Sequence, residues 1–432
     1  MIDRGQSRTS ETHLALTRPL PFLVALSLLV TACVPDATPP ATANTPTATS
    51  STSSTTSSTT SSTTSTSSTT TTTTIPPTTT STLVPQDGLT AAERNLVELT
   101  QITGTISPKS VVSSGTGLFF AQNMMYRHTI TVYNRSYELV ATIPDAIHLA
   151  AYGHDEYEGQ YLGSPVEAAF TSDGAYAFVS NYKMYGGGLS TAAGDGCNAS
   201  GWPDSFIYRV DTQSLEIDQA IRVGPVPKFL AVTPDDRYVV VSNWCGFDVS
   251  VIDVDLGEEI TRVPVGRHPR GIAIAPDSQT AYVAIMGSRH IAVIDLTDFA
   301  VSTMDDIGRS PRHVVLSPDG STMYVSLNGE GRLAKVDIAT GDVLAKVATG
   351  AAPRSMAISD DGTALYVVNY NSNTMSKVRT EDMVELEEHR TGLNPIGITY
   401  DPDSREVWVS NYSGTIQVFT DESSQRHPAS NG

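Results

Sequence analysis

The strongest constraint in this sequence is a repeat of 42 residues. Five prolines follow one another at that constant interval, namely Pro227, Pro269, Pro311, Pro353 and Pro395. The residues after them also recur in type, as in PRGIAIAPDSQTAYVAIM from Pro269 and PRSMAISDDGTALYVVNY from Pro353. A period near 40 residues is typical of β-propeller blades or of stacked helix pairs, so the chain is a repeat protein of one of these two kinds.

The residues inside each unit favour strands. In the unit from Pro269 the apolar runs are GIAIA, TAYVAI, HIAVID and AVSTM, and each is too short for a helix of a two-helix repeat. The runs are rich in Val, Ile, Tyr and Thr, and turn residues such as Pro-Asp and Asp-Gly separate them. Four short antiparallel strands joined by tight turns predict one propeller blade per unit.

Two earlier units, which begin at Pro108 and Pro165, bring the number of units to seven. The last unit ends before it can supply a fourth strand, but Leu96–Ile102 precedes Pro108 as the fourth strands precede later prolines. We therefore predict an all-β fold over residues 87–422. It is a seven-bladed β-propeller of four-stranded antiparallel blades, and its last blade is closed by the N-terminal strand.

Short motifs within the units resemble the YVTN family of bacterial β-propellers over residues 96–420. AYVAI, MYVSLN, LYVVNY and VWVSNY match the family's second strand, and VIDV, VIDL and KVDI its third strand. The resemblance implies a propeller outside the cytoplasm, with the loop after each second strand on the top face. Two insertions, at residues 144–163 and 182–204, would lie on that face, either as binding loops or as tolerated surface additions. Family members differ in function, so the resemblance implies architecture rather than an activity.

The N-terminal region is typical of an exported lipoprotein. In residues 1–32, three arginines precede an apolar run at 22–30, as in a signal peptide. The sequence VTAC that ends at Cys33 resembles the bacterial lipobox, which predicts a lipid on Cys33. Residues 33–86 are almost entirely Thr, Ser, Pro and Ala, which predicts a disordered linker, and 423–432 are predicted to be a disordered tail. We therefore expect attachment to the outer side of the cytoplasmic membrane or to the cell surface.

Charge is distributed unevenly over the repeat. Without the signal peptide, which holds three basic and two acidic residues, the net charge is about −20, and this argues against nucleic acid as a partner. Five blades nevertheless carry a cation directly after the repeat proline: Lys109, Lys228, Arg270, Arg312 and Arg354. These cations would converge on the mouth of the channel. They either form an anion-binding funnel or pair with carboxylates or carbonyls of the next blade.

The sequence contains no P-loop, no His-Glu-x-x-His motif and no serine-hydrolase elbow. Glu167, His268 and His313 lie near the basic positions and are candidates for acid/base chemistry. The favoured interpretation is that they are polar residues that line a wet channel. We predict no metal site and no cofactor.

Cys197 and Cys245 are the cysteines that remain once Cys33 carries a lipid. They follow the second strands of adjacent blades, so the propeller architecture would bring both to the top face. Export permits a disulfide between them, and two unpaired thiols are the alternative.

Two functions are compatible with these features. The first is a surface-anchored, monomeric binding module whose channel mouth holds an anionic small molecule, glycan or protein segment. The second is a hydrolase that resembles the propeller lactonases and uses polar residues at the channel mouth. A redox propeller like the haem-binding propeller of nitrite reductase is a more distant third, because the sequence has no cofactor-attachment motif.

Overall fold

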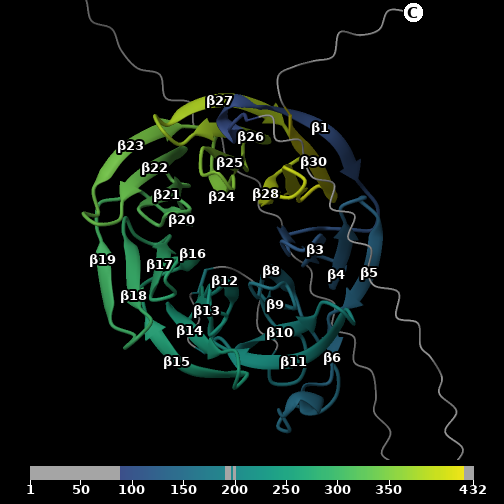
Figure 1. The fold of residues 1–432 in the computed structure, drawn as a ribbon. Coiled ribbons are helices and arrows are strands. Elements are labelled where there is room, and N and C mark those ends of the chain that lie inside the picture. The colour runs from purple at the N-terminus through teal and green to yellow at the C-terminus, as the bar shows by residue number, and fades with distance from the viewer. Residues whose placement is uncertain (1–87, 190–195, 198–200, 423–432) are drawn as a thin grey trace, which may run out of the picture. The chain divides into compact units, whose positions relative to one another are not determined.

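Seven four-stranded antiparallel sheets form a ring in the computed structural model, which describes residues 88–189, 196–197 and 201–422 (Figure 1). The first strand of each repeat unit is innermost and the fourth is outermost. This confirms the predicted all-β, seven-bladed propeller. The predicted signal peptide, Cys33, the linker to residue 86 and the tail at 423–432 lie outside the described residues.

Each blade is given from the innermost strand outward. Blades one to three consist of β2 (Ser110–Ser113), β3 (Leu118–Asn123), β4 (Thr129–Asn134) and β5 (Leu139–Pro144); β8 (Pro165–Phe170), β9 (Tyr176–Asn181), β10 (Ser205–Asp211) and β11 (Glu216–Val223); and β12 (Pro227–Val232), β13 (Tyr238–Asn243), β14 (Asp248–Asp253) and β15 (Glu258–Pro264). Blades four to six consist of β16 (Pro269–Ile274), β17 (Thr280–Ile285), β18 (Ile291–Asp295) and β19 (Val301–Met304); β20 (Pro311–Leu316), β21 (Thr322–Leu327), β22 (Arg332–Asp337) and β23 (Val343–Ala348); and β24 (Pro353–Ile358), β25 (Ala364–Asn369), β26 (Thr374–Arg379) and β27 (Val384–Arg390). Blade seven consists of β28 (Pro395–Asp401), β29 (Glu406–Asn411), β30 (Thr415–Glu422) and β1 (Asn95–Ile102).

The N-terminal strand β1 closes the ring as its outermost strand in blade seven. It pairs antiparallel with β30, from Asn95 opposite Glu422 to Ile102 opposite Ile416. In Figure 1 the purple β1 lies beside the yellow β30, so the two ends of the propeller meet in one sheet. The predicted closure is confirmed. Because every other blade is built from consecutive strands, this pairing is the link that joins the two ends of the domain.

Burial is greatest in the second strand of each blade and least in the outermost strand, and this explains why the strands differ in sequence. All six residues of β13 (YVVVSN) and of β25 (ALYVVN) are buried, because the second strand is covered on both faces by neighbouring blades. The outermost strand β27 (VELEEHR) has no buried residue and is accordingly charged. The apolar cores lie between adjacent blades. Phe119 of blade one, for example, stacks on Trp408 of blade seven with ring centroids 3.8 Å apart.

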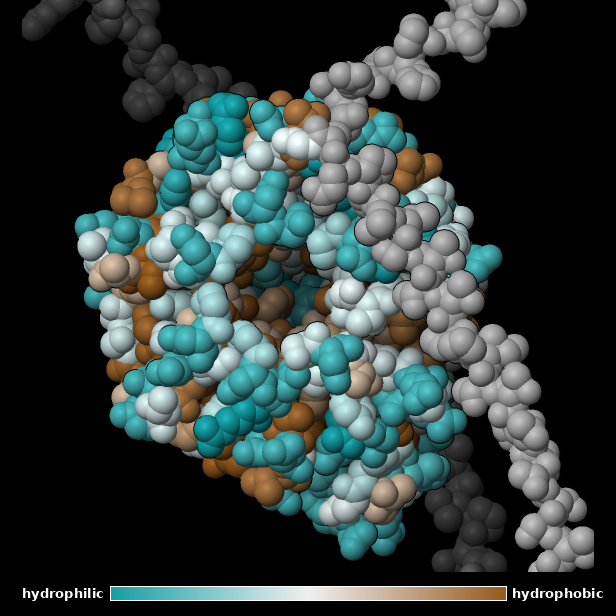
Figure 2. Space-filling model, in the orientation of Figure 1, coloured by the Kyte–Doolittle hydropathy of each residue, from teal (hydrophilic) through white to brown (hydrophobic). Residues whose placement is uncertain are grey.

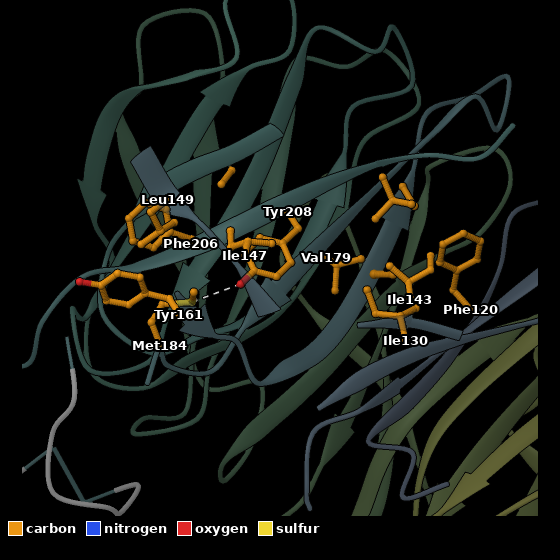
Figure 3. Packing of buried hydrophobic residues seen from close by; sticks show 14 of the residues in the cluster. Phe120, Ile130, Ile143, Ile147, Leu149, Tyr161, Val179, Met184, Phe206 and Tyr208 are labelled. Carbon is orange, nitrogen blue, oxygen red and sulfur yellow. Dashed lines mark hydrogen bonds between the residues drawn. The ribbon is translucent and has the colours of Figure 1, made fainter. Parts of the chain in front are cut away.

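The insertion at residues 144–163 is packed onto blade two. It contains a small hairpin of β6 (Ala146–Ile147) and β7 (Tyr161–Leu162), together with the 3-10 helix η2 (Leu149–Tyr152). Figure 3 shows Leu149 and Tyr161 of this insertion beside Phe206 and Tyr208 of β10, and all four side chains are buried. The insertion is therefore a fixed part of the domain core.

The helical content is small. The structure assigns two short 3-10 helices to the described part of the chain, η1 (Ala91–Glu93) and η2. Over those same residues no helix has the length and apolar character needed to cross a bilayer.

Candidate functional site

A β-bulge at the start of the innermost strand shapes the channel. In blades two to seven the pairing of the first two strands shifts between the repeat proline and a residue two or three positions later. Such a bulge leaves a residue without a ladder partner and re-aims the side chains around it. In consequence, residues one and two positions after the proline both line the channel, at two different levels.

The first level contains the five predicted basic residues. They come from five different blades and line one cavity of about 660 Å³: Lys109, Lys228, Arg270, Arg312 and Arg354. Figure 2 shows a hollow at the centre of the ring, where the inner strands meet. Lys228, Arg270 and Arg312 are each less than one tenth exposed, so these charges lie inside the mouth rather than on the outer surface.

The basic side chains lie close enough to influence one another. Burial holds the pKa of Lys109 well below its usual range, and the neighbouring charges of Arg270, Arg312, Arg354 and Lys228 lower it further. An anion that entered the cavity would relieve this repulsion. The arrangement is therefore suited to binding carboxylate or phosphate groups.

Aromatic rings and backbone oxygen are among the groups that position the cations. Lys228 Nζ lies 4.1 Å from the centroid of a Trp244 ring, and the Arg354 guanidinium lies 3.4 Å from the Tyr370 ring centroid. The guanidinium of Arg270 donates a hydrogen bond to the backbone oxygen of Lys228. Ring faces and carbonyls hold a cation without cancelling its charge, so the contacts preserve the positive potential of the mouth.

Sequence reasoning missed this aromatic layer, although its signal was present. The layer occupies one repeat position, the residue that follows each second strand. Its cavity-lining members are the aromatic residues Tyr182, Trp244, Tyr370 and Tyr412, and methionines occupy the same position at Met124 and Met286. The unit endings SNY, SNW and VNY show this periodic aromatic position in the sequence. Lys183, next to one of these positions, is a further cavity-lining cation that was not predicted.

The second level brings Glu167 and His313 into one smaller cavity of about 230 Å³. Burial raises the pKa of Glu167 to about 7, although Arg270 and Lys109 favour its charged form. Burial and the charges of Arg270 and Arg312 lower the pKa of His313 to about 3, so this imidazole is neutral at physiological pH.

His268, the third candidate for acid/base chemistry, lies elsewhere. Its ring stacks on Trp244 with centroids 4.4 Å apart and meets Phe247 edge-on. It lines neither of the two channel cavities. The structure thus brings Glu167 and His313 together in one cavity, whereas His268 packs against the ring of Trp244.

A disulfide fixes the second insertion at the cavity. Cys197 of that insertion is bonded to Cys245 of the β13–β14 loop, with Cα atoms 5.2 Å apart, which confirms the predicted pair. Cys245 directly follows Trp244, and Tyr182 and Tyr185 at the start of the insertion also line the cavity. In the chain-entropy picture, a crosslink over a loop of this length stabilises the fold by about 4 kcal/mol.

His128 and Asp145 form a second polar pair at this cavity that sequence reasoning missed. His128 lines the cavity from the β3–β4 loop, and its Nδ1 atom lies 3.2 Å from Oδ2 of Asp145. Burial raises the pKa of Asp145 to about 8. Blade four carries His290 and Asp305 at the same two repeat positions, so the repeat by itself did not single out the pair in blade one.

Comparison with solved structures shows the same architecture in other proteins. A chain of hydrazine synthase from Kuenenia stuttgartiensis superposes with a TM-score of 0.59 at 18% sequence identity. The match covers 74% of this chain and 98% of that one, and at this identity it shows the fold alone. The search of curated proteins gave no match.

Comparison with family models gives a match over residues 163–389, which is more than half of the chain. The family is described as "Lactonase, 7-bladed beta-propeller". The matched segment extends from the end of the first insertion to the outermost strand of blade six, and the repeat units on either side complete the same ring. The chain therefore belongs to the lactonase family of seven-bladed β-propellers.

Proposed function

We propose that the propeller binds an anionic ligand at its cationic channel mouth. The observation that supports this proposal is the convergence of five lysine and arginine side chains, from five blades, on one cavity of about 660 Å³. Cavities of this volume suit small molecules, and the end of a glycan or a protein segment could enter the same opening. Guanidinium groups match carboxylate and phosphate geometry, so the expected ligand carries one or more of these groups.

Titration of the propeller with citrate and inorganic phosphate tests this binding. A ligand present at 100 times its dissociation constant should raise the free energy of unfolding by about 2.7 kcal/mol. The affinity should fall as salt is added, because screening weakens charge–charge attraction. Uncharged polyols of similar size serve as the control. If neither anion shifts the unfolding transition more than the polyols do, the proposal is wrong for small anions.

We also propose that the propeller is attached to a membrane through a lipid on Cys33, which lies outside the described residues. The proposal rests on the VTAC sequence at the end of the N-terminal apolar run. The linker at residues 33–86 would then hold the propeller away from the membrane surface.

Cys33→Ser is expected to release the protein from washed bacterial membranes into the soluble fraction, since the hydroxyl cannot receive the thioether-linked lipid. The matched control is the double variant Cys197→Ser/Cys245→Ser, which removes the other two cysteines and should remain attached. Fractionation followed by immunoblotting measures the outcome. Equal membrane retention of Cys33→Ser and the wild type would refute the anchor.

A second candidate function is hydrolysis of a lactone. The family match supports it, because the matched family is described as a lactonase family. The cavity is also lined by both cations and a histidine, His128. A hydrolytic site needs groups that bind the substrate and a group that transfers protons. The two candidates share the same cavity, so anion binding would serve as substrate binding in the second.

A further inference from the structure

His128 is held in one orientation by the two ends of the first insertion. Its Nδ1 atom lies 2.8 Å from the backbone oxygen of Gly163 and 3.2 Å from Oδ2 of Asp145. These residues begin and end the segment that contains the β6–β7 hairpin. The backbones are joined as well, because the Asp145 amide donates to the His128 oxygen (3.2 Å) and the Gly163 amide donates to the Asp145 oxygen (3.3 Å).

These contacts determine the tautomer of His128. A backbone carbonyl can only accept a hydrogen bond, so the Nδ1 atom must carry the hydrogen that points to Gly163. In the neutral imidazole the lone pair then resides on Nε2, at the ring edge opposite to Asp145 and Gly163. The side chain is 28% exposed and lines the same cavity as the five cations. The ring that carries this proton-accepting nitrogen thus borders the space in which those cations would hold a ligand.

Asp145 is placed to support that imidazole. Its carboxyl group is almost fully buried, and its Oδ1 atom has no hydrogen-bond partner among the described residues. The Tyr208 hydroxyl donates to the Asp145 backbone oxygen (3.0 Å), which fixes the residue from the core side. A buried carboxyl group beside Nδ1 orients the ring, and its ionised form stabilises the imidazolium that arises when Nε2 gains a proton, as in other histidine–carboxylate pairs.

We propose that Nε2 of His128 is a general base that activates water for hydrolysis of a carboxylate-bearing lactone, and that Asp145 positions it. This inference rests on the second candidate function. The cationic ring would hold the carboxylate of the lactone while the ester carbonyl lies toward His128. The five cations would then bind the substrate, and His128, positioned by Asp145, would transfer the proton.

The chemical step needs only water as a co-reactant. Nε2 accepts one proton from water while the water oxygen forms a bond to the lactone carbonyl carbon. The tetrahedral intermediate then breaks its bond to the ring oxygen, which receives the proton from Nε2. The product is a hydroxy acid whose new carboxyl group releases the remaining water proton to solvent, so it carries one more carboxylate than the substrate, and His128 returns to its neutral state.

The test compares hydrolysis of 5-oxotetrahydrofuran-2-carboxylate with that of its uncharged parent, γ-butyrolactone, by proton NMR. The wild type should hydrolyse the charged lactone faster. His128→Gln should lower kcat by about 10²- to 10⁴-fold, the usual contribution of general base catalysis. KM and the affinity for citrate should stay within about twofold, because the cations that bind the anion are intact. The matched control is His148→Gln. His148 lies in the first insertion and its Nδ1 also contacts a backbone carbonyl, that of Gly159. This variant should keep full activity.

Asp145→Asn tests the positioning role. We expect a lower kcat with an unchanged KM, together with a change in the ¹⁵N chemical shifts of the His128 ring from the Nδ1–H tautomer toward a mixture. An unchanged tautomer and unchanged kcat would remove Asp145 from the proposal, and full activity of His128→Gln would overturn it entirely. A wild type that binds citrate but hydrolyses neither lactone would also overturn it while leaving anion binding intact. A wild type that fails to bind any anion would instead contradict the proposed binding function.

Discussion

Replacing Lys377 by methionine is expected to lower the free energy of unfolding by about 3–5 kcal/mol, the usual effect of removing one partner of a buried ion pair. Lys377 is fully buried in β26, and its Nζ donates to the carboxylate of Asp421 in β30 and to the backbone oxygen of Arg94 (2.9 Å) just before β1. The lysine therefore connects blade six to both strands of the closing pair. Methionine keeps the length of the side chain but removes the cation that is paired directly with the buried carboxylate of Asp421.

Lys335→Met is the matched control for this experiment. Lys335 occupies the same repeat position one blade earlier, but it is only partly buried and donates to two backbone oxygens, those of Thr380 and Glu381. Its loss should cost about 1 kcal/mol, the typical net value of a hydrogen bond. Urea denaturation measures both variants. An equal decrease in the free energy of unfolding for both variants would mean that the ion pair at the closure adds no stability beyond that of an ordinary lysine contact.

The cost of Lys377→Met should depend on pH. Burial raises the pKa of Asp421 above its ordinary value, and Lys377 lowers it. Removal of Lys377 therefore raises this pKa further. A carboxyl group with a raised pKa in the folded state stabilises the protein below the pKa of its unfolded form, and that stabilisation is lost as the pH rises through the folded value. The variant should consequently approach the wild type in stability as the pH falls toward about 4.

Truncation of residues 90–103 examines the same closure by removing the strand itself, with Lys377 and Asp421 unchanged. It removes β1 and leaves β30 as an exposed edge in blade seven. We expect a lower unfolding temperature and a tendency to associate through the open edge. Thermal unfolding identical to that of the full propeller would contradict the role of β1 in closing the ring.

The triple variant Arg270→Gln/Arg312→Gln/Arg354→Gln is expected to weaken anion binding by at least about 100-fold, since hydrogen bonds to charged groups contribute about 1.5–3 kcal/mol each. All three side chains line the same cavity, and glutamine keeps a polar group of similar size without the charge. The fold should persist, because the substitutions also remove repulsion among neighbouring cations. The pKa of Lys109 should accordingly rise toward its usual value, since Arg270, Arg312 and Arg354 all lower it in the wild type.

A charge-matched control separates local binding from the overall field of the protein. Arg289, Arg332 and Arg390 are exposed arginines outside the channel, and their replacement by glutamine changes the net charge equally. This control should bind anions as the wild type does in isothermal titration. If the channel variant binds anions normally but has a lower free energy of unfolding, the cations stabilise the fold and do not bind the ligand. Arg354→Gln alone, at a partly exposed site, gives the same comparison if the triple variant does not fold.

The sequence by itself determined the architecture because the information for it is local and repeated. Each unit carries its own strands and turns, so the 42-residue period, together with the two longer units that begin at Pro108 and Pro165, was enough to predict seven blades. The missing fourth strand of the last unit and the apolar segment Leu96–Ile102 were enough to predict the closure. The pairing of Cys197 with Cys245 followed once the order of the blades was known, because both lie after second strands of adjacent blades. The five basic residues were also visible, since they share one repeat position.

Other features of the candidate site depend on tertiary structure, because strand pairing and loop paths decide which side chains meet. The bulge at the start of the inner strands puts two successive residues on the channel wall, which alternation along a regular strand would not predict. It is this bulge that places Glu167 and His313 at a level below the cations, while the loop before β16 turns His268 toward Trp244. The contact of His128 with Asp145 and Gly163 depends on how a unique insertion folds back onto blade one. Neither the spacing nor the composition of that insertion specifies this path. Only the packing of its apolar residues against blade two does so, and that packing exists in the folded ring alone.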